Sequence, residues 1–375
     1  YSWLSLSGDG SIVAFSSAPE WDDNDDSEDG YRHPLHDIYI VDTNDGNVEQ
    51  ISYPAPVENQ IDHMYPFVNE DGSLIAYLTS YVDPANTNYT TLFQIRLYDR
   101  HTGETYELDL KTGTYLMDFS FSNDGTHLVY STERYTDGLH SAVYYHKIDM
   151  QADNVFGEPL EIATEVDRTV SISEDGQYIF YMDGPTSDII RHHRTTGEKL
   201  RWKIDDWELE GFINHFNASQ DASVIAFFST ADRSTMYMYD IDSDVLTSLS
   251  SELSLPNYVT GIQDAILSSD GRYVLIEYNS WGTWCCGSGF GLYDTLLDVW
   301  KEVGNPVLGL YSAAMNHNGQ IWAYNIYDQD SGNYAIYIYC SLECESEDTD
   351  SPIQNISWKV PAGSAIGGQL LPGSK

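Results

Sequence analysis

The chain has 375 residues, of which 59 are Asp or Glu and 17 are Lys or Arg, so its formal net charge at pH 7 is −42. This charge repels a phosphate backbone, which excludes general electrostatic binding of nucleic acid, and it disfavours anionic membranes. Intrinsic disorder is also excluded, because 41% of the residues are hydrophobic and 29 Tyr, 12 Phe and 9 Trp are spread along the chain. No stretch reaches the ~18 uncharged apolar residues of a spanning helix, so we expect no membrane insertion.

One sequence pattern recurs seven times along the chain: a short run, a turn of the Asp-Gly type, and an apolar run. Asp-Gly between two alternating runs is a strong β-hairpin signal, because both residues tolerate the positive φ of tight turns. Spacings of 46 to 62 residues between the turns are typical of a repeat fold. The turns are centred on Asp9, Asp71, Asp124, Asp175, Asp221, Asp270 and Asn318.

Each hairpin is followed by a Tyr-rich run, a polar turn and a fourth short run, as at 37–52 and 93–108. Four strands per copy and seven copies predict an all-β fold, a seven-bladed β-propeller with four antiparallel strands per blade. The reason is that each small sheet has two faces that only neighbouring sheets can cover. We place a tail or linker at 359–375 and the blades at about 1–54, 61–110, 115–163, 166–204, 211–251, 261–304 and 309–358.

The runs SEDGQYIFYM (173–182) and SSDGRYVLIE (268–277), together with DIYIVD and MYMYDID, resemble the repeats of TolB-type propellers, also called WD40-like or PD40 repeats. The resemblance covers about 3–358 and departs at Ala222 and Asn318, and the usual Pro before Asp-Gly is missing. It implies a seven-bladed propeller in an exported protein, at the cell surface, outside the cell or in the periplasm. It implies no single function, because these repeats serve protein docking, sugar binding and polysaccharide cleavage alike.

The first variable loop carries a dense acidic run followed by two histidines. Asp25, Ser27 and Asp29 alternate and are followed by a glycine, which is the spacing of oxygen ligands in calcium loops. The match is partial, since His33 and His36 stand where such a loop supplies oxygens. Three interpretations stay open: a calcium site, a transition-metal site at the histidines, and a solvated acidic loop.

The residues that lead into the innermost strands should gather at one mouth of the central channel, where we expect a ligand to bind. The residue six positions before the turn, taken in each of the seven copies, gives this ring: Trp3, Tyr65, Asp118, Thr169, His215, Asp264 and Ser312. Of these, Asp118 and Asp264 are candidate ligand-binding residues.

A lyase at this mouth would use a His or Tyr as acid and base and an Arg to neutralise a uronate. Its candidates are His63, Tyr65, Arg168, His215 and Tyr311. The alternative is that these are ordinary mouth residues, bonded to backbone and water.

Two later segments depart from the acidic surface. Five of the 17 basic residues fall within 191–203, which would bind an anionic chain or an acidic subunit, or would neutralise its own blade edge. In blade six, Trp281, Trp284 and Phe290 lie in a Gly-rich segment that we expect to form a loop. Exposed rings there would bind sugar or anchor a protein, and otherwise they fold back to cap the blade.

Four cysteines allow three disulfide connectivities. Cys340 should end a strand on the face opposite Cys285, so we expect it to pair with Cys344. Cys285 and Cys286 are then either free or joined in a vicinal disulfide.

These patterns predict a secreted or cell-surface module for recognition or assembly that is not catalytic and that binds carbohydrate or protein. Calcium is the one cofactor suggested. Two alternatives stay open: a lyase that acts on anionic polysaccharide at the channel mouth, and a structural subunit that self-assembles into an extracellular filament or surface layer.

Overall fold

A computed structural model describes residues 3–17, 36–52, 61–82, 91–110, 114–134, 140–229, 235–249, 259–282, 285–297, 299–303, 310–328, 333–340 and 354–358. Within these ranges the chain is almost entirely β-strand, with one short 3-10 helix, η1 (Ile204–Trp207). No helix in the described ranges is long and apolar enough to cross a membrane.

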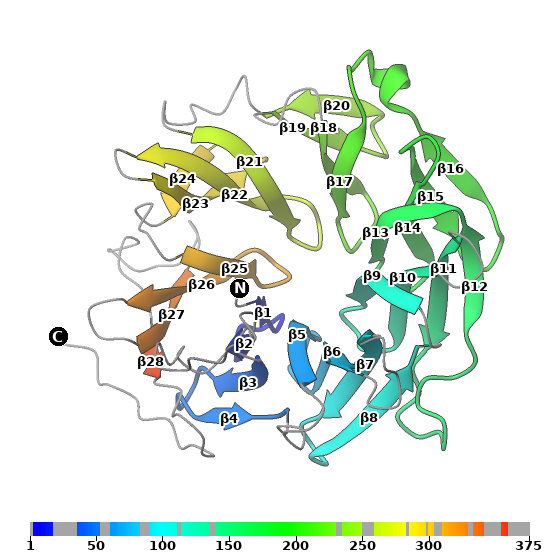
Figure 1. Ribbon diagram of the computed structural model, residues 1–375. Helices are drawn as coiled ribbons and strands as arrows, with labels where there is room; N and C mark the ends of the chain where they lie inside the picture. Colours follow the sequence, from blue (N-terminus) through cyan, green and yellow to red (C-terminus); the bar gives the residue numbers. More distant parts are fainter. Residues whose placement is uncertain are drawn as a thin grey trace, which may run out of the picture.

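Seven sheets of four antiparallel strands follow one another along the chain, and Figure 1 shows them as blades around a common axis. The predicted all-β, seven-bladed propeller is therefore confirmed. Blades 1 to 4 comprise β1 (Leu4–Leu6), β2 (Ile12–Ser17), β3 (Asp37–Asp42), β4 (Val48–Gln50); β5 (Ile61–Val68), β6 (Leu74–Val82), β7 (Thr91–Asp99), β8 (Glu104–Asp109); β9 (Thr114–Phe121), β10 (His127–Arg134), β11 (His140–Lys147), β12 (Leu160–Thr164); and β13 (Val166–Ile172), β14 (Tyr178–Asp183), β15 (Ile189–His193), β16 (Lys199–Trp202). Blades 5 to 7 comprise β17 (Ile213–Ala218), β18 (Val224–Ser229), β19 (Met236–Asp240), β20 (Val245–Ser248); β21 (Val259–Leu267), β22 (Tyr273–Gly282), β23 (Cys285–Asp294), β24 (Val299–Val303); and β25 (Leu310–Met315), β26 (Ile321–Asp328), β27 (Asn333–Cys340), β28 (Gln354–Trp358).

Each blade is apolar on both faces because a neighbouring blade covers each of them. The described core divides into seven clusters, and each cluster joins two adjacent blades. In β2, Val13 and Phe15 pack toward blade 7, whereas Ile12 and Ala14 pack toward blade 2. The strand period of two therefore sends alternate side chains into different interfaces. This double burial explains why the inner strands have nearly continuous apolar sequences.

The ring closes between blades 7 and 1 without a shared strand, because β1–β4 and β25–β28 each form a complete sheet. Leu4 and Leu6 pack with Ala314 and Ile336 across this interface. The Nδ2 of Asn316 also donates a hydrogen bond to the carbonyl of Gly8 at 2.8 Å. Closure therefore depends on apolar burial between two separate sheets.

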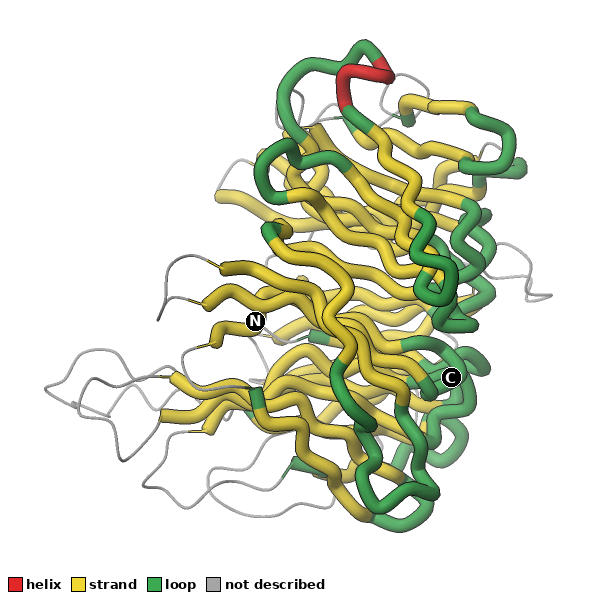
Figure 2. The backbone as a smooth tube through the Cα atoms, turned by 90° about the vertical axis from the view of Figure 1, so that its right-hand side faces the viewer, coloured by secondary structure: helices red, strands yellow, loops and turns green. Residues whose placement is uncertain are grey.

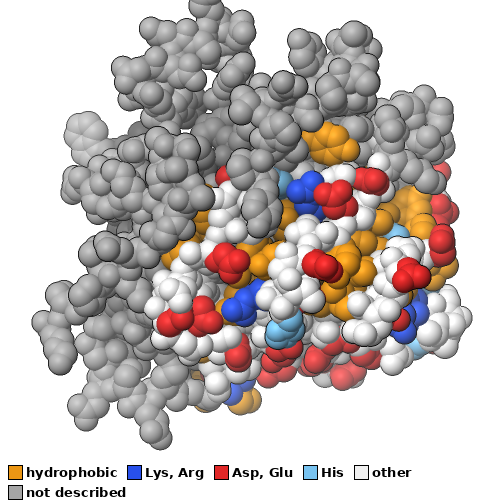
Figure 3. Space-filling model, turned by 90° about the horizontal axis from the view of Figure 1, so that it is seen from below, with side chains coloured by type: hydrophobic (Ala, Val, Ile, Leu, Met, Phe, Trp, Pro, Cys, Tyr) orange, Lys and Arg blue, Asp and Glu red, His pale blue; other side chains and the backbone are white. Residues whose placement is uncertain are grey.

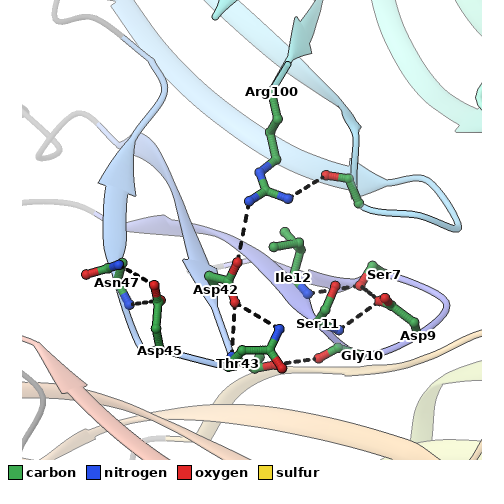
Figure 4. Close-up of polar contacts among 12 residues, drawn as sticks. Ser7, Asp9, Gly10, Ser11, Ile12, Asp42, Thr43, Asp45, Asn47 and Arg100 are labelled. Carbon is green, nitrogen blue, oxygen red and sulfur yellow. Dashed lines mark hydrogen bonds and ion pairs between the residues drawn. The ribbon is translucent and has the colours of Figure 1, made fainter. Parts of the chain in front are cut away.

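The Asp-Gly turns share one pattern of hydrogen bonds, which Figure 4 shows for blade 1. The Ser7 hydroxyl donates to Asp9 Oδ1 (2.8 Å), and this oxygen also accepts from Ser11 N (2.9 Å). The Ser7 hydroxyl in turn accepts from Ile12 N at 2.9 Å. These side chains satisfy the backbone of the turn, so the hairpin is shaped locally. The Ser-to-Asp hydrogen bond recurs at Ser122, Ser173, Ser219 and Ser268.

Neighbouring turns also bond to one another around the channel. Gly8 N donates to Glu70 O (2.9 Å), and Glu70 N donates to Asn123 O (2.7 Å). Asn123 Nδ2 donates to Ser269 Oγ at 3.2 Å, which joins blade 3 to blade 6. The Glu70 carboxylate passes over Gly8, where a side chain would clash with it, and pairs with His317 of blade 7. Polar contacts therefore bridge this end of the channel, and Figure 2 shows the described turns along one side of the disc.

Gly176 and Gly103 provide a matched test of packing at the turns. Both have a left-handed backbone, with φ of +62° and +72°. A methyl group at Gly176 would overlap the His127 ring, whereas at Gly103 it would meet nothing within 4 Å. We expect Gly103→Ala to lower the free energy of unfolding by about 1 kcal/mol through backbone strain. Gly176→Ala should lower it by roughly 2–4 kcal/mol, because overpacking is added. Denaturant titration measures both, and equal losses would contradict this explanation.

Candidate functional site

Bulges shape the mouth of the channel opposite the Asp-Gly turns. Six of the seven innermost strands shift register near this end: β5, β9, β13, β17, β21 and β25. In β17 the pairing steps from Ile213 to His215, and in β21 it steps from Ile262 to Asp264. A bulge breaks the alternation of a strand and changes which way the next side chain points. Six of the seven predicted ring positions stand at these bulges, and the seventh, Trp3, precedes β1.

Contacts between blades connect the ring positions of blades 3 to 6. The Oδ2 of Asp118 accepts from Val170 N at 3.1 Å. Thr169 Oγ1 lies 3.1 Å from His215 Nδ1, and His215 Nε2 lies 3.5 Å from Asp264 Oδ1. These side chains form one row, and with two neighbours described below we call them the mouth cluster: Tyr65, Asp118, Thr169, His215, Asp264 and Glu277.

The His215 ring is held between a hydroxyl and a carboxylate. Burial lowers the pKa of His215, but its hydrogen bond with Asp264 and the negative charges of Asp264 and Asp118 outweigh burial, so the pKa is raised. Asp264 is held in turn by Asn217 Nδ2 (3.1 Å) and Ala265 N (2.8 Å). Because its side chain is 45% exposed, Asp264 presents a carboxylate to solvent at the mouth.

Two carboxyl groups of the cluster hold their protons unusually well. Burial raises the pKa of Asp118 to about 6, although the Val170 N–H and the charge of His215 oppose this rise. Burial, followed by the negative charge of Asp264, raises the pKa of Glu277 to about 7. Glu277 stands on β22 directly opposite Asp264 in the register. The charge of the mouth therefore changes near neutral pH.

Blades 1 and 2 supply an aromatic side to the mouth. The ring centroids of Trp3 and Tyr65 lie 4.1 Å apart. Tyr65 is 42% exposed and has a φ of +53°, which is rare for a residue with a bulky side chain. Burial and then the charges of Asp118 and Asp62 raise the pKa of Tyr65. Tyr65 therefore joins the aromatic side of the mouth to the acidic side.

The five lyase candidates do not all share this mouth. Tyr65 and His215 belong to the mouth cluster. His63 is 1% exposed and lies inside blade 2. Arg168 is exposed within the β13 bulge. The backbone of Tyr311 lies at the β25 bulge, and its side chain is outside the described residues.

The prediction that Phe290 stands exposed on a loop, available to a ligand, is wrong. Its side chain is 2% exposed and packs with Leu275 and Trp322 between blades 6 and 7. The physical reason is that most of the Gly-rich segment forms strand β23, so Phe290 points into a blade interface instead of standing on a loop.

Several other predicted residues fall outside the described part of the chain. The calcium candidates Asp25, Ser27 and Asp29, the loop residue Trp284 and the tail 359–375 are among them, as are Cys344 and the side chains of Trp281, Cys285, Cys286 and Cys340. The backbone register sets Cys285 opposite Gly282 and Cys340 opposite Ile321, which are opposite ends of their blades. The calcium site and the disulfides stay predictions.

Basic side chains of blade 4 engage their immediate surroundings. Arg191 stacks over Tyr178 and Arg194 over Tyr145, each with the guanidinium carbon 4.7 Å from the ring centroid. Arg201 forms ion pairs with two aspartates at 3.1 and 2.8 Å, Asp183 and Asp188. These contacts favour the interpretation that the island neutralises its own blade edge.

Sequence reasoning missed two residues of the mouth, Glu277 and Asn217. A signal for Glu277 was present, because it is one charged residue inside the apolar run of β22. Asn217 carries no such signal, since its partner Asp264 lies in the next blade. No group of three or more His, Cys, Asp or Glu positioned to hold a metal ion occurs among the residues described.

Comparison with known proteins supports the fold. No family model and no curated protein matches the sequence. Among solved structures, a prolyl endopeptidase studied for inter-domain dynamics matches 96% of this chain and 50% of its own, at 11% identity and a TM-score of 0.60. TolB from Acinetobacter baumannii matches 71% of this chain and 58% of its own (16% identity, TM-score 0.47). Hydrazine synthase from Kuenenia stuttgartiensis matches 72% of this chain and 75% of its own (13% identity, TM-score 0.47).

This chain thus spans only 50% and 58% of the lengths of the endopeptidase and TolB chains. At such identities the likeness shows the fold alone, a seven-bladed β-propeller, and it does not show the function.

The raised pKa values predict that stability falls as the pH rises. A group whose folded pKa exceeds its unfolded value stabilises the fold fully below the unfolded value and loses that contribution as pH passes the folded value. For Glu277 the window runs from 4.5 to about 7, and the raised pKa of His215 acts in the same direction. We expect Glu277 to account for roughly 2 kcal/mol of lost unfolding free energy between pH 5 and 8.

Denaturant titrations of wild type and Glu277→Gln at pH 5 and 8 measure this loss. The variant should show a smaller fall than wild type, because its amide does not titrate. A fall of the same size in both proteins would mean that Glu277 is not held protonated by burial.

Proposed function

We propose that this protein is a non-catalytic recognition propeller whose mouth face binds a partner protein through a basic side chain of that partner. One observation carries the proposal: Asp264 Oδ1 lies 3.5 Å from His215 Nε2, the charges of both Asp264 and Asp118 act on that histidine, and Glu277 stands opposite Asp264 in the register. A Lys or Arg side chain that enters this cluster would replace repulsion between carboxylates with attraction. The net charge of −42 would also speed the encounter with a basic partner.

Carbohydrate is a second candidate ligand, favoured by the aromatic side of the mouth. The Trp3 and Tyr65 rings offer a face for stacking, beside carboxylates that accept hydrogen bonds from sugar hydroxyls. A neutral sugar suits this environment better than a uronate, which three carboxylates would repel.

The two other hypotheses have weaker support. A lyase needs a cation and an acid–base pair in one pocket, but His63 is buried within blade 2 and Arg168 is exposed in a bulge. Self-assembly through blade 4 would have to break the contacts of Arg191 and Arg201 within their own blade. For location we propose the cell surface, the extracellular medium or the periplasm, as the resemblance of the repeats implies.

Pentalysine tests the mouth as a site for basic side chains. We expect the double variant Asp264→Asn/Glu277→Gln to bind pentalysine about tenfold more weakly than wild type, because two central charges are lost. Wild-type affinity should also rise between pH 5 and 8, as Asp118 and Glu277 lose their protons at about 6 and 7. Isothermal titration calorimetry at both pH values measures the two effects.

The matched control is Glu198→Gln/Asp205→Asn, which removes two charges from exposed positions, one in the turn between β15 and β16 and one in η1. It should leave pentalysine affinity nearly unchanged. Equal weakening in both double variants, or an affinity that ignores pH, would reject the mouth as the site. Tight binding of a neutral cello-oligosaccharide with no pentalysine binding would favour the second candidate.

We also propose that Asp25, Ser27 and Asp29 bind a calcium ion. An ion that binds only the native state must raise the melting temperature. Adding a chelator should lower that temperature by several degrees, and Asp25→Asn/Asp29→Asn should remove the difference. If the chelator does not change the melting temperature, the proposed calcium site is rejected.

A further inference from the structure

A pocket of about 610 Å³ lies between blades 2 and 3, outside the mouth cluster. Its walls are β8 of blade 2 and the face of blade 3 formed by β10, β11 and β12. Tyr130 pairs with Tyr144 across β10 and β11, and Tyr144 pairs with Glu161 across β11 and β12. Cross-strand partners share a side of the sheet, so these three side chains stand together on the pocket face.

Aromatic rings form the floor of this pocket. The Tyr130 centroid lies 5.5 Å from that of Tyr144 and 5.6 Å from that of His146, whose ring meets Phe156 at 6.4 Å. Tyr130, His146 and Phe156 are buried, whereas Tyr144 is half-buried. His146 Nδ1 lies 3.0 Å from the Phe156 carbonyl, which can only accept, so Nδ1 carries the hydrogen and the ring is fixed. The floor is therefore preorganised.

The rim of the pocket is acidic. None of its lining residues is Lys or Arg, and five carry a carboxyl group: Glu107, Asp109, Glu158, Glu161 and Glu165. Glu107 pairs with Arg96 at 2.8 Å, and Asp109 accepts a hydrogen bond from Gln94. The other three are exposed glutamates. Figure 3, a view onto the side of the disc near β4 and β8, shows carboxylates among hydrophobic side chains on the described surface.

Two other pockets between blades carry their own cations. The pocket between blades 3 and 4 is lined by Lys199 and Arg201, and Arg201 pairs with Asp183 in the same lining. The pocket between blades 5 and 6 is lined by Arg272, which pairs with Asp294. Of these three pockets, only the one between blades 2 and 3 has carboxylates around an aromatic floor and neither Lys nor Arg in its lining.

We propose that the pocket between blades 2 and 3 binds a small organic cation, an alkylguanidinium or alkylammonium group. The faces of Tyr130 and Tyr144 attract a cation and pack against its alkyl stem. Glu158, Glu161 and Glu165 accept charge-assisted hydrogen bonds from its N–H groups. The cation has two sources, a free amine or a side chain of a peptide, and both offer the same chemistry. This site does not depend on the function proposed for the channel mouth.

Butylguanidinium and butylurea provide the probe pair, because they have nearly the same shape and differ in charge. We expect butylguanidinium to bind at least about tenfold more tightly than butylurea, with the affinity falling as salt is added. Glu161→Gln/Glu165→Gln should weaken the cation roughly five- to tenfold and leave butylurea unchanged. Tyr144→Ala should weaken it to a similar extent, whereas Tyr144→Phe, which keeps the ring, should bind within about twofold of wild type. NMR titration measures all of these affinities.

Two controls separate this pocket from the general negative field and from the mouth. Glu198→Gln/Asp205→Asn removes the same charge elsewhere and should leave the affinity for butylguanidinium unchanged, as should Asp264→Asn/Glu277→Gln at the mouth. A capped tripeptide with a central arginine distinguishes the sources, since it competes with butylguanidinium only if the pocket admits a side chain. Equal affinity for butylurea, or an equal loss of affinity in Glu198→Gln/Asp205→Asn, would overturn the proposal.

Discussion

A four-stranded sheet that is apolar on both faces is stable only when both faces are covered, and the rest of this molecule follows from that requirement. Each of the seven described core clusters belongs to two blades, so no blade has a core of its own. The last interface is the most demanding, because blades 7 and 1 are not consecutive in the chain and no strand from one end of the chain joins the sheet at the other end. Leu6 and Ile336 pack together there, and the Asn316–Gly8 hydrogen bond joins the same two blades at the turn end. The Glu70–His317 pair links blade 2 to blade 7 over Gly8 of blade 1.

The two ends of the disc differ in structure: the turn end repeats one hydrogen-bond pattern, and the mouth carries the bulges and the mouth cluster. At the turn end, local hydrogen bonds repeat from blade to blade, and contacts such as Asn123–Ser269 bridge the channel. At the mouth, bulges break the strand period and free side chains from the blade interfaces. A carboxyl group such as Glu277, inside an otherwise apolar strand, is tolerated because the mouth reaches solvent there, at the expense of a raised pKa. Asp118 and Glu277, the carboxyl groups of the mouth cluster with raised pKa values, therefore lie at the end of the disc where bulges make the repeat irregular.

Both proposed sites share one electrostatic feature, which is that carboxylates outnumber the cationic side chains beside them. The chain has few Lys and Arg, and described members such as Arg201 and Arg272 already pair within their blades. Carboxylates at the mouth and between blades 2 and 3 are left to attract cations from outside. The aromatic rings beside them, Tyr65 at the mouth and Tyr144 in the pocket, add surfaces that a cation or a sugar face can contact.

The sequence by itself determined the fold, because turn chemistry and strand period are local: Asp175 and Gly176 specify their hairpin whatever surrounds them. It also indicated that Asp118, His215 and Asp264 stand at one end of the disc, since position in the repeat sets the end of the strand. Only the tertiary structure decided which side chains meet, because the contacts cross between blades and bulges shift the register by one residue. For that reason Phe290 lies in the core and Glu277 lies at the mouth. The pocket at Tyr144 likewise depends on the tertiary structure, because its walls come from two different blades.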